Sequence, residues 1–515
     1  MTELRAGSAT IPIKPPLGLP LVGFVRRYQT ANKYGADLET SALVLDDGGS
    51  RVAIVGVDTL GIQSPDVDVL RRRIAKSIDA HIDGVLLNWN HTHSAPPGTR
   101  PLALLGIGGD VGDTVPGPLD EYIRHMHECV VEVARVAASR LERAAVTWGV
   151  GAANLAVNRR EITPSGRVII GWRPDGLVDN SVTVLQARRA DASVIATAVN
   201  YGCHPVALGA DALEYSSDFP GHMREYIRDW AGGDVIFLQG AAGNVIPRVG
   251  FGTDKEAASC GRRLALEALH AVADRTAGQP RWTRGKDGSA TPYSVYRVEY
   301  DLAAQTQLRA SAAEVRFPLL PLPSLEAAAE NLSEMESAYQ SAVEALADRG
   351  ELNIRRFHLI WARRTEAAIR DGTAPNDVGG RIHAIRIGGG AIVTGPGEIF
   401  TEIGLAIKER SPALPTMYLG YTNGAVSYFP TAAAYPEGGY EPEFGNRTYG
   451  LPAPVAPVCE ELLVSRSLQL LRGLFPDRPA ATAPGFQATG SIPSIPPERS
   501  PEPPSLNSNL EERSR

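Results

Sequence analysis

The chain has 515 residues, of which 43% are hydrophobic and 21% are charged, and its formal net charge is -7. This composition is close to that of an average soluble globular protein, and it excludes wholesale disorder, a collagen-like rod and an acidic solvating chain. The 51 basic residues form no basic stripe of the kind that nucleic-acid-binding domains show, so we expect no nucleic-acid partner. The length suits one large α/β unit or several smaller domains.

The four cysteines include no C-x-x-C pair, which predicts buried, reduced thiols rather than a disulfide framework. The first residues carry charges and prolines but lack the apolar core of a signal peptide. No run approaches the ~18 apolar residues that a membrane span requires. The sequence therefore predicts a soluble, cytoplasmic protein.

Apolar runs that resemble strands alternate with helical periods over the first half of the chain. The predicted strands are 41–46, 51–57, 85–87, 181–187, 194–201 and 235–239. The predicted helices, in which apolar residues recur at helical spacing, are 64–80, 119–141 and 217–230. This alternation is typical of an α/β fold with a mixed-sheet core and helices on its faces.

The second half contains a helical insertion at about 324–371, rich in Ala, Glu, Leu and Arg. A break at Asp348-Arg349-Gly350 indicates two helices, a pattern that fits a helical hairpin. Sheet and helix patterns then resume at 382–387, 391–394 and 456–474. Proline and serine dominate 476–515, which predicts a disordered tail. We therefore expect one large unit, residues 1–475, followed by this tail.

Histidine is scarce, with ten in the whole chain, so the segment His91-Thr92-His93 stands out. It follows an apolar strand and enters a loop of Ser, Pro and Gly, and open α/β folds place their sites in such strand-end loops. Imidazole is a common ligand of zinc, and two histidines at i and i+2 can face one pocket. By itself the pattern indicates either a metal site or an ordinary polar loop.

Further polar residues follow other predicted strands or precede helices. His204 lies at a strand end, and the proline after it favours a rigid loop. Asp218 stands just before a helix, where it could be the N-cap rather than a catalytic group. Asn244 belongs to a small-residue loop whose backbone N–H groups can approach a ligand. Glu398 could be a site carboxylate or an acid in the first turn of a helix, where the helix dipole favours it. Tyr428 lies in a long polar, aromatic loop, and loops of this kind are often functional.

Taken together and in chain order, these segments resemble the N-terminal catalytic domain of the neutral (non-lysosomal) ceramidase family, from about Arg5 to Leu474. The motifs that carry the resemblance are His91-Thr92-His93-Ser94, His204-Pro205, Ser217-Asp218, Gly243-Asn244, Pro396-Gly397-Glu398 and Ser427-Tyr428. Members of this family hold one catalytic zinc ion with two histidines, a glutamate and a tyrosine. The resemblance implies that the metal ligands here are His91, His204, Glu398 and Tyr428. It also implies that His93 supports the ligands or faces the substrate.

Asn158-Arg159-Arg160 resembles a family segment whose arginine lines the site, so Arg160 or Arg159 would bind an oxyanion or a carboxylate. One loop departs from the family. Where ceramidases have roughly Gly-Asp-Val-Ser-Pro-Asn, this chain has Gly243 to Arg248, and the serine implicated as nucleophile is replaced by Ile246. The family's C-terminal immunoglobulin-like domain is not recognisable either. The sequence is thus identified as a divergent member without the family's serine, and ceramide is not the expected substrate.

These features predict a zinc-dependent hydrolase that acts on an amide, ester or lactone bond of a small molecule by direct attack of zinc-bound water. His93 or Asp218 would move the proton, while Asn244 with nearby backbone N–H groups, or Arg160, would stabilise the oxyanion. The sequence leaves three alternatives open. These are a non-catalytic binding protein on the same fold, a zinc lyase or isomerase, and an amidohydrolase-type barrel enzyme.

Overall fold

The computed structural model describes residues 3–101, 115–273, 279–284, 296–301 and 307–478. The chain divides into two units, 1–481 and 482–515, and the described residues all belong to the first. The tail expected from residue 476 onward therefore falls almost wholly outside the described residues and stays a prediction.

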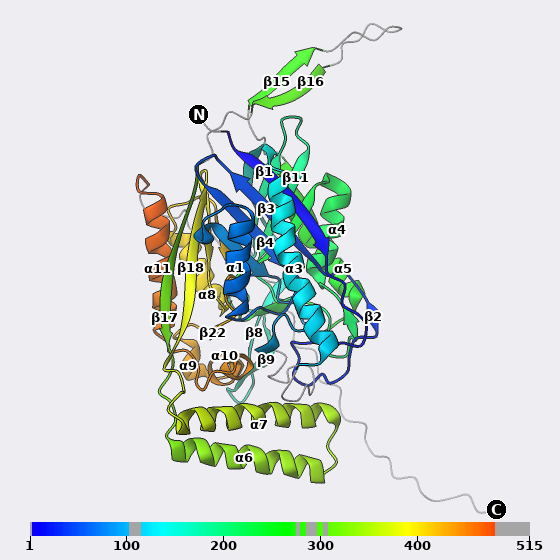
Figure 1. Ribbon diagram of the computed structural model, residues 1–515. Coiled ribbons are helices and arrows are strands. Elements are labelled where there is room, and N and C mark those ends of the chain that lie inside the picture. Colours follow the sequence, from blue (N-terminus) through cyan, green and yellow to red (C-terminus); the bar gives the residue numbers. More distant parts are fainter. Residues whose placement is uncertain (1–2, 102–114, 274–278, 285–295, 302–306, 479–515) are drawn as a thin grey trace, which may run out of the picture. The chain divides into compact units, whose positions relative to one another are not determined.

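Three larger sheets form the body of the first unit (Figure 1). The first has the order β5-β4-β3-β1-β6, with β1 Arg5–Pro12, β3 Glu39–Asp46, β4 Arg51–Val57, β5 Val85–Trp89 and β6 Glu142–Arg143. The second has the order β13-β11-β10-β7, with β7 Ala145–Ala152, β10 Ser181–Arg188, β11 Val194–Tyr201 and β13 Asp234–Gln239. The third has the order β17-β18-β19-β21, with β17 Leu308–Pro318, β18 Asp377–Ile387, β19 Gly390–Thr394 and β21 Thr416–Leu419. Each sheet combines antiparallel pairs with a parallel pair (β4–β5, β11–β13 and β19–β21), which confirms the predicted mixed-sheet α/β fold.

The inner faces of the three sheets meet in one apolar core. Ile54 and Leu86 from the first sheet, Leu185 and Leu238 from the second and Ile392 from the third all belong to it, and each is 0% exposed. Full burial of a side chain of this size stabilises the folded state by about 1.5–3 kcal/mol. This shared core therefore fixes how the three sheets lie relative to one another.

Helices cover the outer faces of the sheets. They are α1 (Asp66–Ser77) and α3 (Gly117–Ser139) on the first sheet, α4 (Phe219–Ala231) and α5 (Asp254–Ala273) on the second, and α8 (Thr401–Arg410) and α11 (Cys459–Leu474) on the third. Their buried residues recur at helical spacing, as Leu119, Ile123, Met126 and Val130 do in α3. The predicted helices at 64–80, 119–141, 217–230 and 456–474 correspond to α1, α3, α4 and α11.

Shorter elements complete the first unit. The small sheets contain β2 (Lys33–Tyr34), β8 (Ala156–Ile162), β9 (Val168–Arg173), β12 (Glu214–Tyr215), β14 (Val245–Pro247), β15 (Gln279–Arg284), β16 (Tyr296–Asp301), β20 (Glu398–Ile399) and β22 (Tyr428–Phe429). The short helices are η1 (Ile82–Gly84), α9 (Ala434–Glu437), α10 (Tyr440–Glu443) and η2 (Gly445–Tyr449). The sequence patterns had not indicated β8, β9 or β17, because their residues mix polar and apolar types.

The insertion expected at 324–371 is a pair of helices, α6 (Leu325–Glu344) and α7 (Arg349–Arg370), packed against each other. The side chains of Ser324 and Asp348 accept hydrogen bonds from backbone N–H groups of the first turns, which explains where the two helices begin. The prediction of two helices here is confirmed (Figure 1).

The helix α7 contacts the loops near the sheets. Its Phe357 packs against Val22 and Leu60 in a small buried cluster. The side-chain amide of Asn353 donates a hydrogen bond to the backbone carbonyl of Val25. The loop that contains Val22 and Val25 is therefore held from outside by the insertion.

The described strands form open sheets and no closed barrel, so the amidohydrolase-type barrel alternative is wrong.

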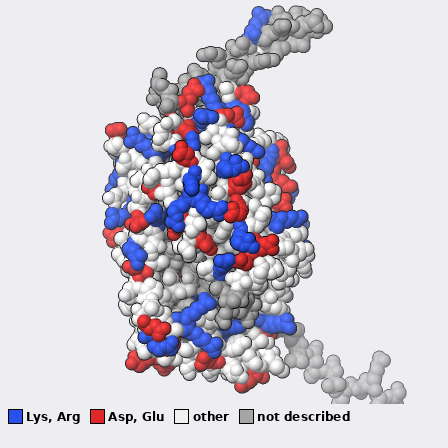
Figure 2. All heavy atoms as spheres, in the orientation of Figure 1, with Lys and Arg blue, Asp and Glu red and all other residues white. Residues whose placement is uncertain are grey.

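In the part of the chain that the structure describes, no helix has the combination of length and apolar character that a membrane span needs. Figure 2 shows basic and acidic side chains intermixed on the face that carries α1 and α3. One such pair is Arg73 of α1 and Glu128 of α3.

The strand β5 supports the loop that follows it, so its core contacts are a suitable measure of the fold's stability. Leu87 of β5 is 0% exposed, and Leu87→Ala should lower the free energy of unfolding by about 2–5 kcal/mol because it leaves a cavity. Leu266 of α5 is 53% exposed, and Leu266→Ala should change it by about 0.5 kcal/mol or less. Denaturant unfolding measures both, and equal losses would contradict the assignment of the core.

Candidate metal centre

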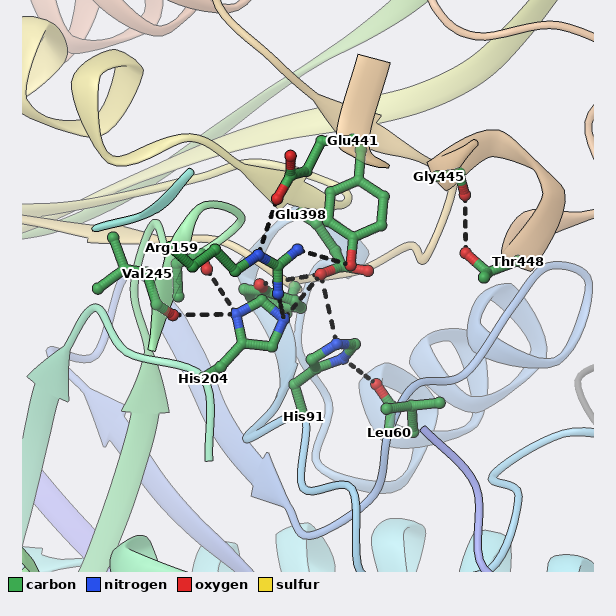
Figure 3. Close-up of polar contacts among 12 residues, drawn as sticks. Leu60, His91, Arg159, His204, Val245, Glu398, Glu441, Gly445 and Thr448 are labelled. Carbon is green, nitrogen blue, oxygen red and sulfur yellow. Dashed lines mark hydrogen bonds and ion pairs between the residues drawn. The ribbon is translucent and has the colours of Figure 1, made fainter. Parts of the chain in front are cut away.

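Three histidines meet where strands of different sheets end. His91 lies two residues beyond β5, His204 follows β11, and His93 belongs to the same loop as His91. Nitrogen atoms of the three rings all lie within 4.8 Å of one another, and these residues can hold a metal ion. Figure 3 shows His91 and His204 on either side of the Glu398 carboxylate.

Backbone carbonyls orient two of these rings. Nδ1 of His91 lies 2.6 Å from the carbonyl oxygen of Leu60, and Nδ1 of His204 lies 2.6 Å from that of Ala242. Because a carbonyl oxygen only accepts, a neutral ring in this position carries its hydrogen on Nδ1 and a lone pair on Nε2. Burial is the main cause that lowers the pKa of His204 to about 4, so the ring is neutral at pH 7. Such carbonyl contacts are typical of histidines that ligate a metal through the other nitrogen.

Glu398 brings a carboxylate to the same point. Its Oε2 lies 3.0 Å from Nε2 of His204 and 3.4 Å from Nε2 of His91. Two atoms bound to one tetrahedral zinc ion at about 2.0–2.1 Å lie roughly 3.3–3.4 Å apart, close to both separations. Imidazole nitrogens and carboxylate oxygens are both ligands that zinc accepts, so the residues present fit such an ion.

Phenol groups surround the carboxylate. Tyr449 donates its hydroxyl hydrogen bond to Oε1 of Glu398 at 2.6 Å, and Tyr421 donates to Oε2 at 3.3 Å. Tyr428 lies opposite Glu398 in the parallel pair of β20 and β22. Its oxygen accepts a hydrogen bond from Nη2 of Arg159 at 3.2 Å. The structure thus brings Tyr428 beside the carboxylate, and its role as a ligand stays a prediction.

Both ring nitrogens of His93 lack a hydrogen-bond partner among the described residues. The ring lies against Gly23, where a Cβ would come within 2.4 Å of it, and the φ of +108° at Gly23 also requires glycine. Arg27 donates a hydrogen bond to the backbone carbonyl of His93 at 2.6 Å. Burial lowers the pKa of His93 well below its ordinary value, so the ring is neutral. A buried, unsatisfied imidazole is available to an ion or to a substrate.

The arginines of β8 take different positions. Arg159 donates from Nε to Oε1 of Glu441 at 2.8 Å, and it lines the cavity at the histidines. Arg160 donates to Oε2 of Glu441 at 2.9 Å and pairs with Glu437 at 3.1 Å, and it is not among the cavity residues. Both guanidinium groups reach Glu441, but of the two only Arg159 also reaches a histidine, with its Nη1 3.4 Å from Nε2 of His204. The structure places Arg159 there, whereas the sequence had placed Arg160 first.

Asp218 and Asn244 lie in hydrogen-bond networks outside the cavity lining. The carboxylate of Asp218 accepts hydrogen bonds from the backbone N–H groups of Phe219 and Leu208, so the residue caps α4. Burial is the main cause that raises the pKa of Asp218 to about 6. Asn244 donates to Glu402 at 2.8 Å and accepts from the first backbone N–H of α8. Catalytic roles for these two residues stay predictions, without a contact to the histidines in the described structure.

His91 and His93 open onto a cavity of about 130 Å³. Its polar wall is formed by His91, His93, Arg159, Glu398, Tyr428, Tyr440, Thr448 and Tyr449. Its apolar wall is formed by Phe24, Leu60, Ile170, Val206, Ile246, Phe251 and Ala425. Ile246 therefore contributes an apolar surface to this cavity.

Several residues of this site were not predicted, among them Tyr421, Tyr449 and Glu441. Tyr421 lies in the polar loop that the sequence had singled out, so its position was a signal that could have been used. Tyr449 and Glu441 lie in the short helices after β22, where no periodic pattern or motif marks them. Their only signal is the cluster of tyrosines between Tyr421 and Tyr449.

The donor set gives a direct test. We expect the purified protein to bind close to one zinc ion per chain, and His91→Ala or His204→Ala to lose most of it, because each change removes a converging Nε2 atom. Elemental analysis measures the metal content. His222→Ala is a matched control, since His222 pairs with Asp254 at the surface of α4 and should leave the zinc content unchanged. Full zinc occupancy in both site variants would refute the assignment.

No family model and no curated protein matches the chain. Solved structures do match it in fold. A ceramidase complexed with C2 is 16% identical, has a TM-score of 0.64, and the match covers 94% of this chain and 77% of that one. The neutral ceramidase from Pseudomonas aeruginosa is 17% identical, with a TM-score of 0.63 and coverage of 94% and 76%. The chain therefore has a neutral-ceramidase-like fold.

Proposed function

We propose that the chain is a zinc-dependent hydrolase of a small molecule with an amide, ester or lactone bond, and that residues 1–475 act as one catalytic unit. The observation that carries the proposal is the convergence of His91 Nε2, His204 Nε2 and Glu398 Oε2 at 3.0 to 3.4 Å. His91, His204, Glu398 and Tyr428 would hold the ion. The fold shared with ceramidases supports hydrolysis.

A zinc ion held there would supply Lewis acidity, which polarises a carbonyl group and lowers the pKa of water. The remaining roles belong to this chain's own side chains. Arg159 presents a guanidinium to the cavity beside Tyr428 and can donate a hydrogen bond to a developing oxyanion. The neutral His93, with both nitrogens free of described partners, can accept a proton at one of them.

The surroundings of Ile246 support direct attack by water. Its side chain lines the cavity but offers no nucleophile, so the reaction would form no acyl-enzyme at this position. Ile246 packs with Val157 and Val206, with Phe24 beside them. This apolar wall favours a substrate that presents hydrocarbon next to its reactive bond.

The charged side chains of the cavity are paired within the protein or face the proposed metal site. Arg159 is already paired with the buried carboxylate of Glu441, and Glu398 faces the two histidines. These side chains alone set no preference for a charged or a neutral substrate, and a zinc ion beside one carboxylate would add net positive charge. The cavity of about 130 Å³ suits a compact group at the reactive bond.

A panel of substrates tests the proposal. Zinc-loaded protein should hydrolyse at least one class among short-chain amides, esters and lactones, and removal of the metal should abolish turnover. Turnover that survives metal removal would exclude the zinc mechanism. Elimination or isomerisation products without hydrolysis would favour the lyase or isomerase alternative. Zinc binding without any turnover would favour the alternative of a non-catalytic binding protein.

Two substitutions separate chemistry from metal binding. His93→Ala and Arg159→Met should retain zinc but lower kcat by about 10²–10³-fold, the effect of losing one proton-transfer group or one oxyanion donor. Arg160→Met provides the comparison within the same strand and should have the smaller effect on kcat. Loss of zinc in His93→Ala would instead make His93 a ligand, and a larger effect of Arg160→Met would reverse the assignment of the two arginines.

A further inference from the structure

The side chain of Gln239 connects the two loops that carry the candidate ligands. It is the last residue of β13 and is 0% exposed. Its Nε2 donates one hydrogen bond to the backbone carbonyl of Asn90 at 2.9 Å and another to that of Cys203 at 2.8 Å. Asn90 immediately precedes His91, and Cys203 immediately precedes His204. Both hydrogens of this amide thus go to the peptide groups next to the two histidines.

The acceptor end of the same amide is used as well. Oε1 of Gln239 accepts from the backbone N–H of Cys203 at 3.3 Å and from that of Gly240 at 3.1 Å. The full hydrogen-bonding capacity of the side chain is therefore satisfied inside the protein. Glutamate in the same place would lack both donors, and asparagine is one methylene shorter.

These bonds matter because the two loops leave different sheets. β5, which precedes His91, belongs to the first sheet, while β11 and β13 belong to the second. No described backbone ladder joins β5 to β13. Asn88 of β5 adds a second link, since its Oδ1 accepts from the backbone N–H of Gln239 at 2.8 Å and its Nδ2 donates to the carbonyl of Gly420 at 2.9 Å. Gly420 directly follows β21, so the two amides tie all three sheets together at one edge.

The peptide before His91 is also held from its other side. The Asn90 side chain donates to Oδ1 of Asp58 at 2.8 Å and accepts from the backbone N–H of Thr92 at 3.1 Å. His91 itself has a φ of +68°, a conformation that non-glycine residues keep only where their surroundings impose it. A small shift of the Asn90 carbonyl would therefore rotate the His91 ring away from the common point.

We infer that Gln239 is a positioning residue that sets the separation of His91 and His204 and thereby the affinity of the site for its metal ion. The inference rests on the proposed zinc site. Gln239 touches neither the ion nor the substrate, and it acts through the two carbonyl groups that precede the ligands.

The test compares zinc affinity between variants by competition with a chelator. Gln239→Met keeps the length of the side chain, removes its hydrogen bonds, and should weaken zinc binding by about 10–100-fold, as changes next to metal ligands commonly do. Gln186→Met is the matched control. Gln186 is 1% exposed and lies on β10 of the same sheet, where it donates to Thr197. The Gln186→Met protein should lose thermal stability but keep a zinc affinity within twofold of the parent's.

A second variant covers the case in which Gln239→Met does not fold. Gln239→Asn retains an amide that can reach one carbonyl but not both, and it should also weaken zinc binding at least tenfold. A zinc affinity within twofold of the parent in either folded variant would overturn the inference. An equal loss in the Gln186→Met control would also overturn it. If the parent protein itself binds no zinc, the proposed function fails together with this inference. If the parent binds zinc and the Gln239 variants keep its affinity, only this inference fails.

Discussion

The site depends on one electrostatic constraint: two imidazole nitrogens with lone pairs and one carboxylate oxygen are buried together, facing the same point. His204 Nε2 and Glu398 Oε2 are 3.0 Å apart, and His91 Nε2 lies 3.4 Å from the same oxygen. Carbonyl groups on the far side of each ring keep the hydrogens on Nδ1. In a medium of low polarity such an arrangement is costly without a cation at its centre. The rest of the protein can be understood as the structure that keeps these three groups from moving apart.

That structure is the common edge of three sheets. Each sheet contributes strand ends to the site, and the sheets are joined both by the apolar core between their inner faces and by amide side chains at the edge. The core resists sliding of one sheet over another, because large aliphatic side chains from all three interdigitate in it. Hydrogen bonds add direction, which apolar contacts lack. Together they give a rigid frame, while the three histidines lie on loops that follow its strands.

Much of this arrangement could be predicted from the sequence, and the reason lies in local pattern. The strands that end in His91 and His204 are continuous apolar runs, and the helices that cover them have clear helical periods. Chain order of short motifs was enough to group His91, His204 and Glu398. What could not be predicted depends on register and on contacts between distant segments. The choice between Arg159 and Arg160 requires the face of β8, and the link from Gln239 to Asn90 joins residues 149 positions apart. Tyr449 and Glu441 lie in short helices without any period.

The placement of α7 has a consequence for how proteins of this fold diverge. The helix holds the loop that carries Gly23 and Phe24, and its Phe357 touches Leu60, whose carbonyl orients His91. The insertion thus contacts both a wall of the cavity and the support of one candidate ligand, yet it contributes nothing to the three-sheet frame. An exchange of this helical hairpin between related chains would alter the shape of the cavity and leave the frame intact. The shape of the cavity and the stability of the frame can therefore change separately, since different parts of the chain determine them.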